Sequence, residues 1–198
     1  EKGQTLGIVG PTGSGKTTLL RLLLREHDLE QGDILLNGIS IKDYRLEDLR
    51  SLIGYVPQDQ ILFAMTIREN VAFSDPQIEE EEVMKALRTC GVYEDILAMP
   101  DQMETVLGER GVSLSGGQKQ RAVIARMFAS DPDIFVLDEP TTGMDATTKS
   151  DFYELMHHSA HYHQKSVLMI THDPEEVNQF ADRNIHLVRD QSSPWRCF

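Results

Sequence analysis

The sequence predicts an α/β protein with a mostly parallel sheet, and two features of the chain support this fold class. Near both ends, short apolar runs that suit buried strands alternate with segments whose apolar residues recur at helical spacing. This alternation is typical of a parallel sheet with helices on both faces. Between Gln58 and Gly117 the strand-like runs stop, and the pattern becomes helical and acidic. We therefore expect a sheet domain into which a helical subdomain is inserted.

The individual elements follow from hydrophobic periodicity and from the turn residues between them. The chain begins with an apolar run, TLGIV, a turn-rich loop, GPTGSGK, and a segment of helical spacing, KTTLLRLLLREH. The expected strands are Thr5–Val9, Asp33–Gly38, Leu52–Gln58, Asp133–Pro140, Ser166–His172 and Asn184–Val188. The expected helices are Lys16–His27, Arg45–Ser51, Ile78–Cys90, Gln118–Ala129 and Thr147–Ala160. The terminal QSSPWRCF has no periodicity, and we expect it to be loop.

Length and hydropathy favour one domain of ordinary globular type. At 198 residues and 40% hydrophobic content, the chain is long enough to bury a substantial core. Its longest apolar runs stay well below the roughly 18 to 20 residues of a membrane span. Its start, EKGQ, lacks the basic and apolar stretches of a signal peptide. The sequence therefore predicts a soluble, cytoplasmic chain without direct membrane insertion.

Charge and cysteine content exclude further classes of function. The formal net charge is −13 at pH 7, whereas nonspecific nucleic-acid binders need clustered cations for the phosphate backbone. We therefore expect no nucleic-acid partner. Cys90 and Cys197 show no metal-type spacing, so they suggest neither a zinc site nor a disulfide framework.

A phosphate-binding loop is predicted by GPTGSGKT, which matches G-x-x-x-x-G-K-[ST] between an expected strand and an expected helix. Its glycines allow successive backbone N–H groups to converge on phosphate oxygens, and the helix N-terminus adds partial positive charge. Lys16 would reach the β- and γ-phosphates, and the Thr17 hydroxyl would ligate Mg²⁺. The alternative is a glycine-rich turn that binds nothing. The expected contacts to the phosphate-bearing ligand come from Gly10, Pro11, Thr12, Gly13, Ser14, Gly15, Lys16, Thr17 and Thr18.

Two carboxylates end the apolar run DIFVLDE and complement this loop. A buried parallel strand that ends in carboxylates places them at the edge where ligands of open α/β sheets bind. Asp138 is expected on the Mg²⁺ side, and Glu139 is placed to act as general base on an attacking water. Taken alone, an acidic pair after a strand is more often an ordinary strand end, but the phosphate loop favours the catalytic interpretation.

His172 follows another apolar run, Ser166–Ile170, in MITHD. A lone histidine at such a place is usually structural, so its role depends on its neighbours.

Taken together, GPTGSGKT, YVPQDQ, LSGGQ, FVLDEP, TGMD and ITHD, in this order, resemble the nucleotide-binding domain of an ABC transporter. The resemblance spans about Gly10 to Asp173, and LSGGQ is highly specific to that family. It implies a P-loop NTPase fold and a single domain, with a RecA-like core over 1–58 and 130–198 and a helical subdomain over about 59–129. It also implies an ATPase that uses ATP and Mg²⁺ at the inner face of the cell membrane.

The resemblance also implies roles for three further residues. Gln58 would touch Mg²⁺ and the attacking water and would sense the transmembrane domain. His172 would contact the γ-phosphate, and Asp145, in TGMDA, would lie across a dimer interface.

In this family two domains pack head to tail, so that each ATP lies between the phosphate loop of one and the LSGGQ signature of the other. The partners implied are therefore a second nucleotide-binding domain, identical or different, and the transmembrane domains of a transporter. Ser115 and Gly117 would present a hydroxyl and a backbone N–H to the partner's γ-phosphate. The neighbouring Gly116 and Gln118 belong to the same signature. Simple helix capping by Ser115 is the alternative, and both interpretations can hold.

The resemblance changes its character along the chain. Through about Gln120 the sequence is similar to exporters, whereas from about Ala122 onward it resembles the ATPases of bacterial zinc or manganese importers. An exporter would more usually have SALD where this chain has TGMD. We therefore expect a mosaic of two parents, joined inside or just after the signature helix.

The start of the chain also departs from the family pattern. Only residues 1–9 precede Gly10, whereas the family has an antiparallel β region there with an aromatic residue that stacks on adenine. This region is expected to be truncated, so nucleotide binding is expected to be weak but dependent on the phosphates. The rival interpretation is a chimeric or truncated chain that folds but has little or no ATPase activity. A chromosome-remodelling or DNA-repair ATPase is disfavoured by the acidity and by the lack of sustained heptads.

Overall fold

The computed structural model describes residues 1–73, 75–108, 114–188 and 196–197, and it divides into two compact units. The sheet unit comprises Glu1–Tyr55, Pro132–Glu139 and Ala160–Phe198. The helical unit comprises Val56–Asp131 and Pro140–Ser159.

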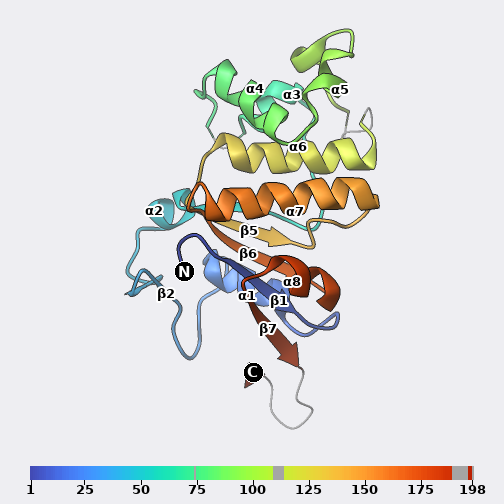
Figure 1. The fold of residues 1–198 in the computed structure, drawn as a ribbon. Helices are drawn as coiled ribbons and strands as arrows, with labels where there is room; N and C mark the ends of the chain where they lie inside the picture. Colours follow the sequence, from blue (N-terminus) through green and yellow to red (C-terminus); the bar gives the residue numbers. More distant parts are fainter. Residues whose placement is uncertain (74, 109–113, 189–195, 198) are drawn as a thin grey trace. The chain divides into compact units, whose positions relative to one another are not determined.

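The strands form a mostly parallel sheet in the order β4-β5-β6-β1-β7-β8. In Figure 1, β5, β6, β1 and β7 lie side by side in that order. The pairs β1–β6, β1–β7 and β5–β6 are parallel, and β7–β8 is antiparallel. The predicted α/β fold class is therefore confirmed. The strand bounds are β1 Thr5–Val9, β4 Ile53–Val56, β5 Ile134–Asp138, β6 Ser166–Thr171, β7 Arg183–Val188 and β8 Arg196–Cys197.

The register of the sheet brings three strand ends to one edge. Val9, at the end of β1, pairs with Thr171 at the end of β6, and Asp138, at the end of β5, pairs with Ile170. The residues that follow these strands are the phosphate loop, Glu139 and His172. Parallel pairing thus explains why the motifs, which are far apart in the sequence, share one edge.

Apolar side chains from the sheet and from two helices form the core of the sheet unit. Ile8, Val136 and Ile170 pack with Leu20 of α1 and Leu49 of α2. A small antiparallel pair of strands contributes Leu36 at its margin. The bounds of these elements are α1 Lys16–Leu23, α2 Leu46–Ser51, α8 Pro174–Phe180, β2 Leu35–Leu36 and β3 Ile39–Ser40.

The helical unit is organised around α6, which Figure 1 shows between the short helices α3 to α5 and the long helix α7. Val123, Ile124 and Ala125 of α6 are buried, as are Val83 and Leu87 of α4. Across the described ranges, no helix combines the length and apolar character that crossing a bilayer requires. The bounds are α3 Ile67–Val71, α4 Glu80–Thr89, α5 Tyr93–Leu97, η1 Gln102–Glu104, α6 Gly116–Ala129 and α7 Ala146–His161.

Several expected boundaries were wrong. Helix α1 ends at Leu23 rather than His27, because Arg25 adopts a left-handed backbone conformation with φ of 50°. The predicted strand Asp33–Gly38 shrinks to β2, because Asn37 and Gly38, with φ of 52° and 78°, turn the chain into β3. The prediction of a loop for the terminal QSSPWRCF is wrong at Arg196–Cys197. These residues form β8, whose backbone pairs with β7. The other residues of that tail lie outside the described ranges.

Gly7 marks a close approach between β1 and α8, which yields a stability prediction. A Cβ at this position would lie 2.3 Å from Val177 Cγ1 and 3.1 Å from Ala181 Cβ. We expect Gly7→Ala to reduce the free energy of unfolding by about 1 to 3 kcal/mol, measured by urea denaturation. Val177→Ala removes the clashing methyl groups, so the double variant is expected to lose less stability than the sum of the single variants. Additive losses would contradict this packing.

Candidate functional site

The loop between β1 and α1 has the backbone conformation that a phosphate cradle needs. Gly13 and Gly15 have φ of 79° and 95°, values that side-chain-bearing residues rarely adopt. Gly10 has no room for a side chain, since a Cβ there would lie 2.6 Å from the Leu187 carbonyl oxygen. Because the residue before α1 is Gly15, no side chain caps this helix N-terminus. The first-turn N–H groups and the helix dipole therefore suit an anion.

Two buried polar side chains in the loop fit a phosphate group. Lys16 is 7% exposed, and its Nζ donates to the carbonyl oxygens of Gly10 at 2.6 Å and Pro11 at 3.1 Å. The Ser14 Oγ is buried and has no hydrogen-bond partner among the described residues. A buried hydroxyl without a partner is costly. Phosphate oxygens would accept hydrogen bonds from both side chains, so this loop fits the predicted nucleotide.

Thr17 and Asp138 meet at the base of the loop and form an oxygen pair that fits Mg²⁺. The Thr17 hydroxyl donates to Asp138 Oδ2 at 3.1 Å. Burial raises the pKa of Asp138, while the Thr17 hydrogen bond and the positive charge of Lys16 oppose this shift. A hydroxyl and a carboxylate are the kind of hard ligand that Mg²⁺ prefers.

Glu139 and His172 form the second polar pair at this edge. His172 Nδ1 lies 2.7 Å from Glu139 Oε2. The Glu139 side chain is 11% exposed and that of His172 is 66% exposed, so the pair joins a nearly buried carboxylate to an accessible imidazole. The Glu139 backbone has φ of 50°, and its N–H donates to the Ile170 carbonyl. Such a conformation in a non-glycine residue persists only where neighbouring contacts hold it.

The structure therefore gathers the phosphate loop, Asp138, Glu139 and His172 within the sheet unit. The predicted residues Gln58, Ser115 to Gln118 and Asp145 belong to the helical unit instead. Gln58 is exposed and follows β4.

The signature forms the N-terminus of α6 in the helical unit. Ser115 Oγ accepts from the Gln118 N–H at 3.2 Å, and Gln118 Oε1 accepts from the Ser115 N–H at 3.0 Å. This capping box confirms the helix-capping interpretation of Ser115. Apart from its chain neighbours and the nearby backbone of α6, a Cβ at Gly116 or Gly117 would meet no described atom within 4 Å. The glycines thus keep an open space beside a helix N-terminus.

Asp145 has a structural role that the sequence reasoning missed. Its carboxylate accepts from the Thr148 N–H at 3.0 Å and from the Thr148 hydroxyl at 2.8 Å, at the start of α7. These hydrogen bonds lower the pKa of Asp145, and the bond from the Thr148 backbone N–H has the larger effect. The spacing D-x-x-T before a helix was the signal that could have revealed this cap.

Thr171 and Glu176 are further residues that sequence reasoning missed. The Thr171 hydroxyl donates to Glu176 Oε2 at 2.8 Å, and this buried hydrogen bond lies directly before His172 in the chain. Asp173 accepts from the Glu175 N–H and caps α8. The chain on both sides of His172 is thus fixed by local hydrogen bonds.

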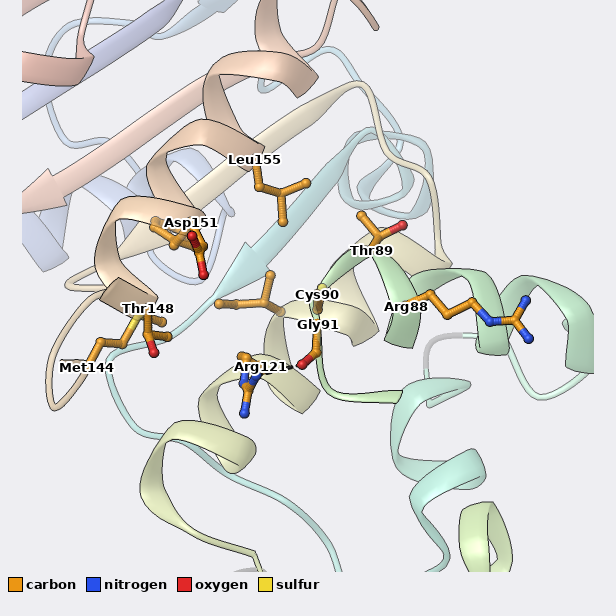
Figure 2. Close-up of a pocket in the computed structure, with 11 residues that line it drawn as sticks. Arg88, Thr89, Cys90, Gly91, Arg121, Met144, Thr148, Asp151 and Leu155 are labelled. Atoms are coloured by element: carbon orange, nitrogen blue, oxygen red, sulfur yellow. Dashed lines mark hydrogen bonds between the residues drawn. The ribbon is translucent and has the colours of Figure 1, made fainter. Parts of the chain in front are cut away.

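The helical unit contains a cavity of about 200 Å³ between the end of α4, α6 and α7 (Figure 2). Arg121 points to Gly91, whose carbonyl accepts its hydrogen bond, and also binds the Asp95 carboxylate. Burial raises the pKa of the lining Cys90 thiol, so this cysteine is a poor nucleophile at neutral pH. None of the predicted site residues is among the described residues that line this cavity.

The pKa of Asp138 yields a prediction on pH dependence. Because the folded state raises this pKa, folding favours the protonated carboxyl, and that stabilisation is lost as pH rises from about 4 through the folded pKa. Without Mg²⁺, Asp138→Asn should therefore gain stability relative to the wild type over this range. Urea denaturation at several pH values measures the difference, with Asp133→Asn at the other end of β5 as matched control. A difference between wild type and Asp138→Asn that stays constant with pH would contradict the prediction.

Comparisons with known proteins found a matching family model and several relatives. A family model described as ABC transporter matches residues 1–142. The zinc transport system ATP-binding protein AdcC of Streptococcus pneumoniae is 48% identical over 212 residues, which cover 100% of this chain and 84% of that protein. The probable multidrug resistance ABC transporter ATP-binding/permease protein YheI of Bacillus subtilis is 44% identical over 149 residues, covering 75% of this chain.

A solved structure shares the fold. The structure of a bacterial Atm1-family ABC exporter with ATP bound superposes with a TM-score of 0.88, at 35% sequence identity and over 94% of this chain. The chain spans 32% of that exporter and 26% of the Bacillus protein. The relatives thus include a zinc transport protein and proteins of the exporter type.

Proposed function

The chain belongs to the ABC transporter family, and from that premise we propose that it binds and hydrolyses ATP as a head-to-tail dimer that couples hydrolysis to transport. The observation that carries this proposal is the adjacency of two polar pairs at one sheet edge. The Thr17 hydroxyl oxygen lies 3.1 Å from Asp138 Oδ2. Glu139 is the next residue, and its Oε2 lies 2.7 Å from His172 Nδ1. One pair suits a metal ion and the other suits proton transfer.

The loop residues bind and orient the nucleotide in this proposal. Lys16 and the N–H groups at the start of α1 hold the β- and γ-phosphates, and Ser14 gains the partner that its hydroxyl lacks. Thr17 and Asp138 would hold Mg²⁺, and we propose Gln58 as a further ligand. When bound, Mg²⁺ neutralises charge on the phosphate oxygens.

Glu139 acts as the general base. Its carboxylate accepts a proton from water as the water oxygen attacks the γ-phosphorus in line, and the bond to the β–γ bridging oxygen breaks to give ADP and phosphate. His172 holds Glu139 Oε2, which orients the carboxylate, and its accessible imidazole reaches the γ-phosphate.

A second nucleotide-binding domain completes each site. Ser115 and Gly117 donate to the γ-phosphate bound by the partner, and Gly116 and Gln118 shape this surface, while Asp145 lies at the same interface. Its short cap on α7 gives the interface a fixed backbone. ATP then joins the two domains, its hydrolysis releases them, and transmembrane domains follow this cycle.

We also propose that the chain is a mosaic, exporter-like through about Gln120 and importer-like from about Ala122. Relatives of both kinds support this proposal. Sequence identity should therefore be measured separately for the two segments. We expect exporters to be more similar than importer ATPases in the first segment and less similar in the second.

Phosphate release measured at increasing chain concentration tests the proposed function. We expect Mg²⁺-dependent release whose rate per chain rises with concentration as dimers form, and background release for Lys16→Ala. Equal, background-level rates in both would favour the rival interpretation, a folded chain without activity.

A further inference from the structure

We propose that Gln120 is a positioning residue for Glu139, which deepens the proposed ATPase function and rests on it. The Gln120 Nε2 donates to the Pro140 carbonyl at 2.6 Å, and both residues are buried. Pro140 directly follows Glu139 in the chain. The amide therefore fastens the backbone next to the general base.

Pro140 passes this restraint to its neighbour because its ring fixes φ. With one dihedral angle locked, the direction of the Pro140 carbonyl is tied closely to the peptide that joins Pro140 to Glu139. Glu139 itself has φ of 50°, a conformation that needs external contacts to persist. Its N–H is held by the Ile170 carbonyl at 2.9 Å, and Gln120 supplies a contact on the C-terminal side.

The burial of Gln120 argues against a role in stability alone. Its side chain is almost fully buried, at 2% exposure, and its Oε1 has no hydrogen-bond partner among the described residues. A buried acceptor without a partner costs free energy that offsets the gain from the single hydrogen bond. An apolar residue of similar size would lack the hydrogen bond to the Pro140 carbonyl, so we infer that the amide serves this contact.

Gln120 lies in α6, so its hydrogen bond links this helix to Pro140. The same helix begins at the Ser115 capping box, the surface that we propose for the partner's ATP. A second amide acts on the same loop, since Gln60 Nε2 lies 3.5 Å from the Thr142 carbonyl. Gln120 thus ties the signature helix to Pro140, the residue that follows the general base in the chain.

The test compares Gln120→Leu with the wild type in steady-state phosphate release and in thermal unfolding. We expect kcat to fall about 10-fold to 100-fold, because small displacements of a catalytic group have effects of this size. KM for Mg-ATP and the unfolding temperature should change little. Gln77→Leu, at an exposed glutamine, is the matched control and should keep the wild-type rate.

A double variant separates positioning from a general structural effect. If Gln120 acts through Glu139, Gln120→Leu should cause no further loss of rate in a Glu139→Gln background. An unchanged kcat in Gln120→Leu, or an equal loss in both backgrounds, would overturn the proposal. If Gln120→Leu unfolds, Gln120→Met provides the same comparison. An inactive wild type would instead refute the proposed function, so the two failures are distinguishable.

Discussion

Glu139→Gln is expected to lower the rate of ATP hydrolysis by about 100-fold to 10,000-fold while Mg-ATP binding is retained. The amide has nearly the same shape as the carboxylate, so packing at its largely buried position is preserved. It cannot accept the proton of the attacking water, however. Steady-state phosphate release gives the rate, and isothermal titration gives the nucleotide affinity.

Glu175→Gln is the matched control for this experiment. Glu175 is an exposed glutamate in the first turn of α8, close in sequence to His172. The Glu175→Gln substitution removes the same negative charge but leaves the Thr17–Asp138 and Glu139–His172 pairs unchanged, so wild-type activity is expected. A Glu139→Gln rate equal to that of an active wild type would exclude Glu139 as general base.

Local sequence patterns predicted the strands that end at the candidate site well. The run TLGIV corresponds to β1 with the same bounds. A short apolar run that contains β-branched residues and ends at a glycine-rich loop favours a buried strand. Asp138 ends β5 and Glu139 directly follows it, as expected. The pairing of the strand ends then follows from parallel register.

Contacts that depend on tertiary packing could not be predicted. Glu139 and His172 are 33 positions apart, and only the sheet register brings them together. The bond from Gln120 to Pro140 likewise gives no periodic signal in the sequence. Helices α3 and α5 have five residues each, which is too short for a helical period to emerge. Their positions are set by packing and by the Thr66 capping box.

Gly117→Asp is expected to reduce hydrolysis by at least about 100-fold, because a carboxylate beside the partner's γ-phosphate repels it strongly. The monomer should remain folded. A Cβ at this position would meet no described atom within 4 Å apart from its chain neighbours and the nearby backbone of α6, and a negative charge at a helix N-terminus is stabilising. Phosphate release and the unfolding temperature measure both effects. Gly117→Ala is the matched control and should retain most of the activity, whereas a large loss there would point to a steric effect instead.

Mixing the Lys16→Ala and Gly117→Asp chains tests the composite site most directly. Each variant alone lacks either both phosphate loops or both signatures, so each should be inactive. In a mixed dimer, the intact loop of the Gly117→Asp chain meets the intact signature of the Lys16→Ala chain, and one complete site forms. We predict that phosphate release reappears on mixing and depends on the concentrations of both chains. Release that stays at background, although the wild type and each folded variant behave as described above, would contradict a site shared between two copies.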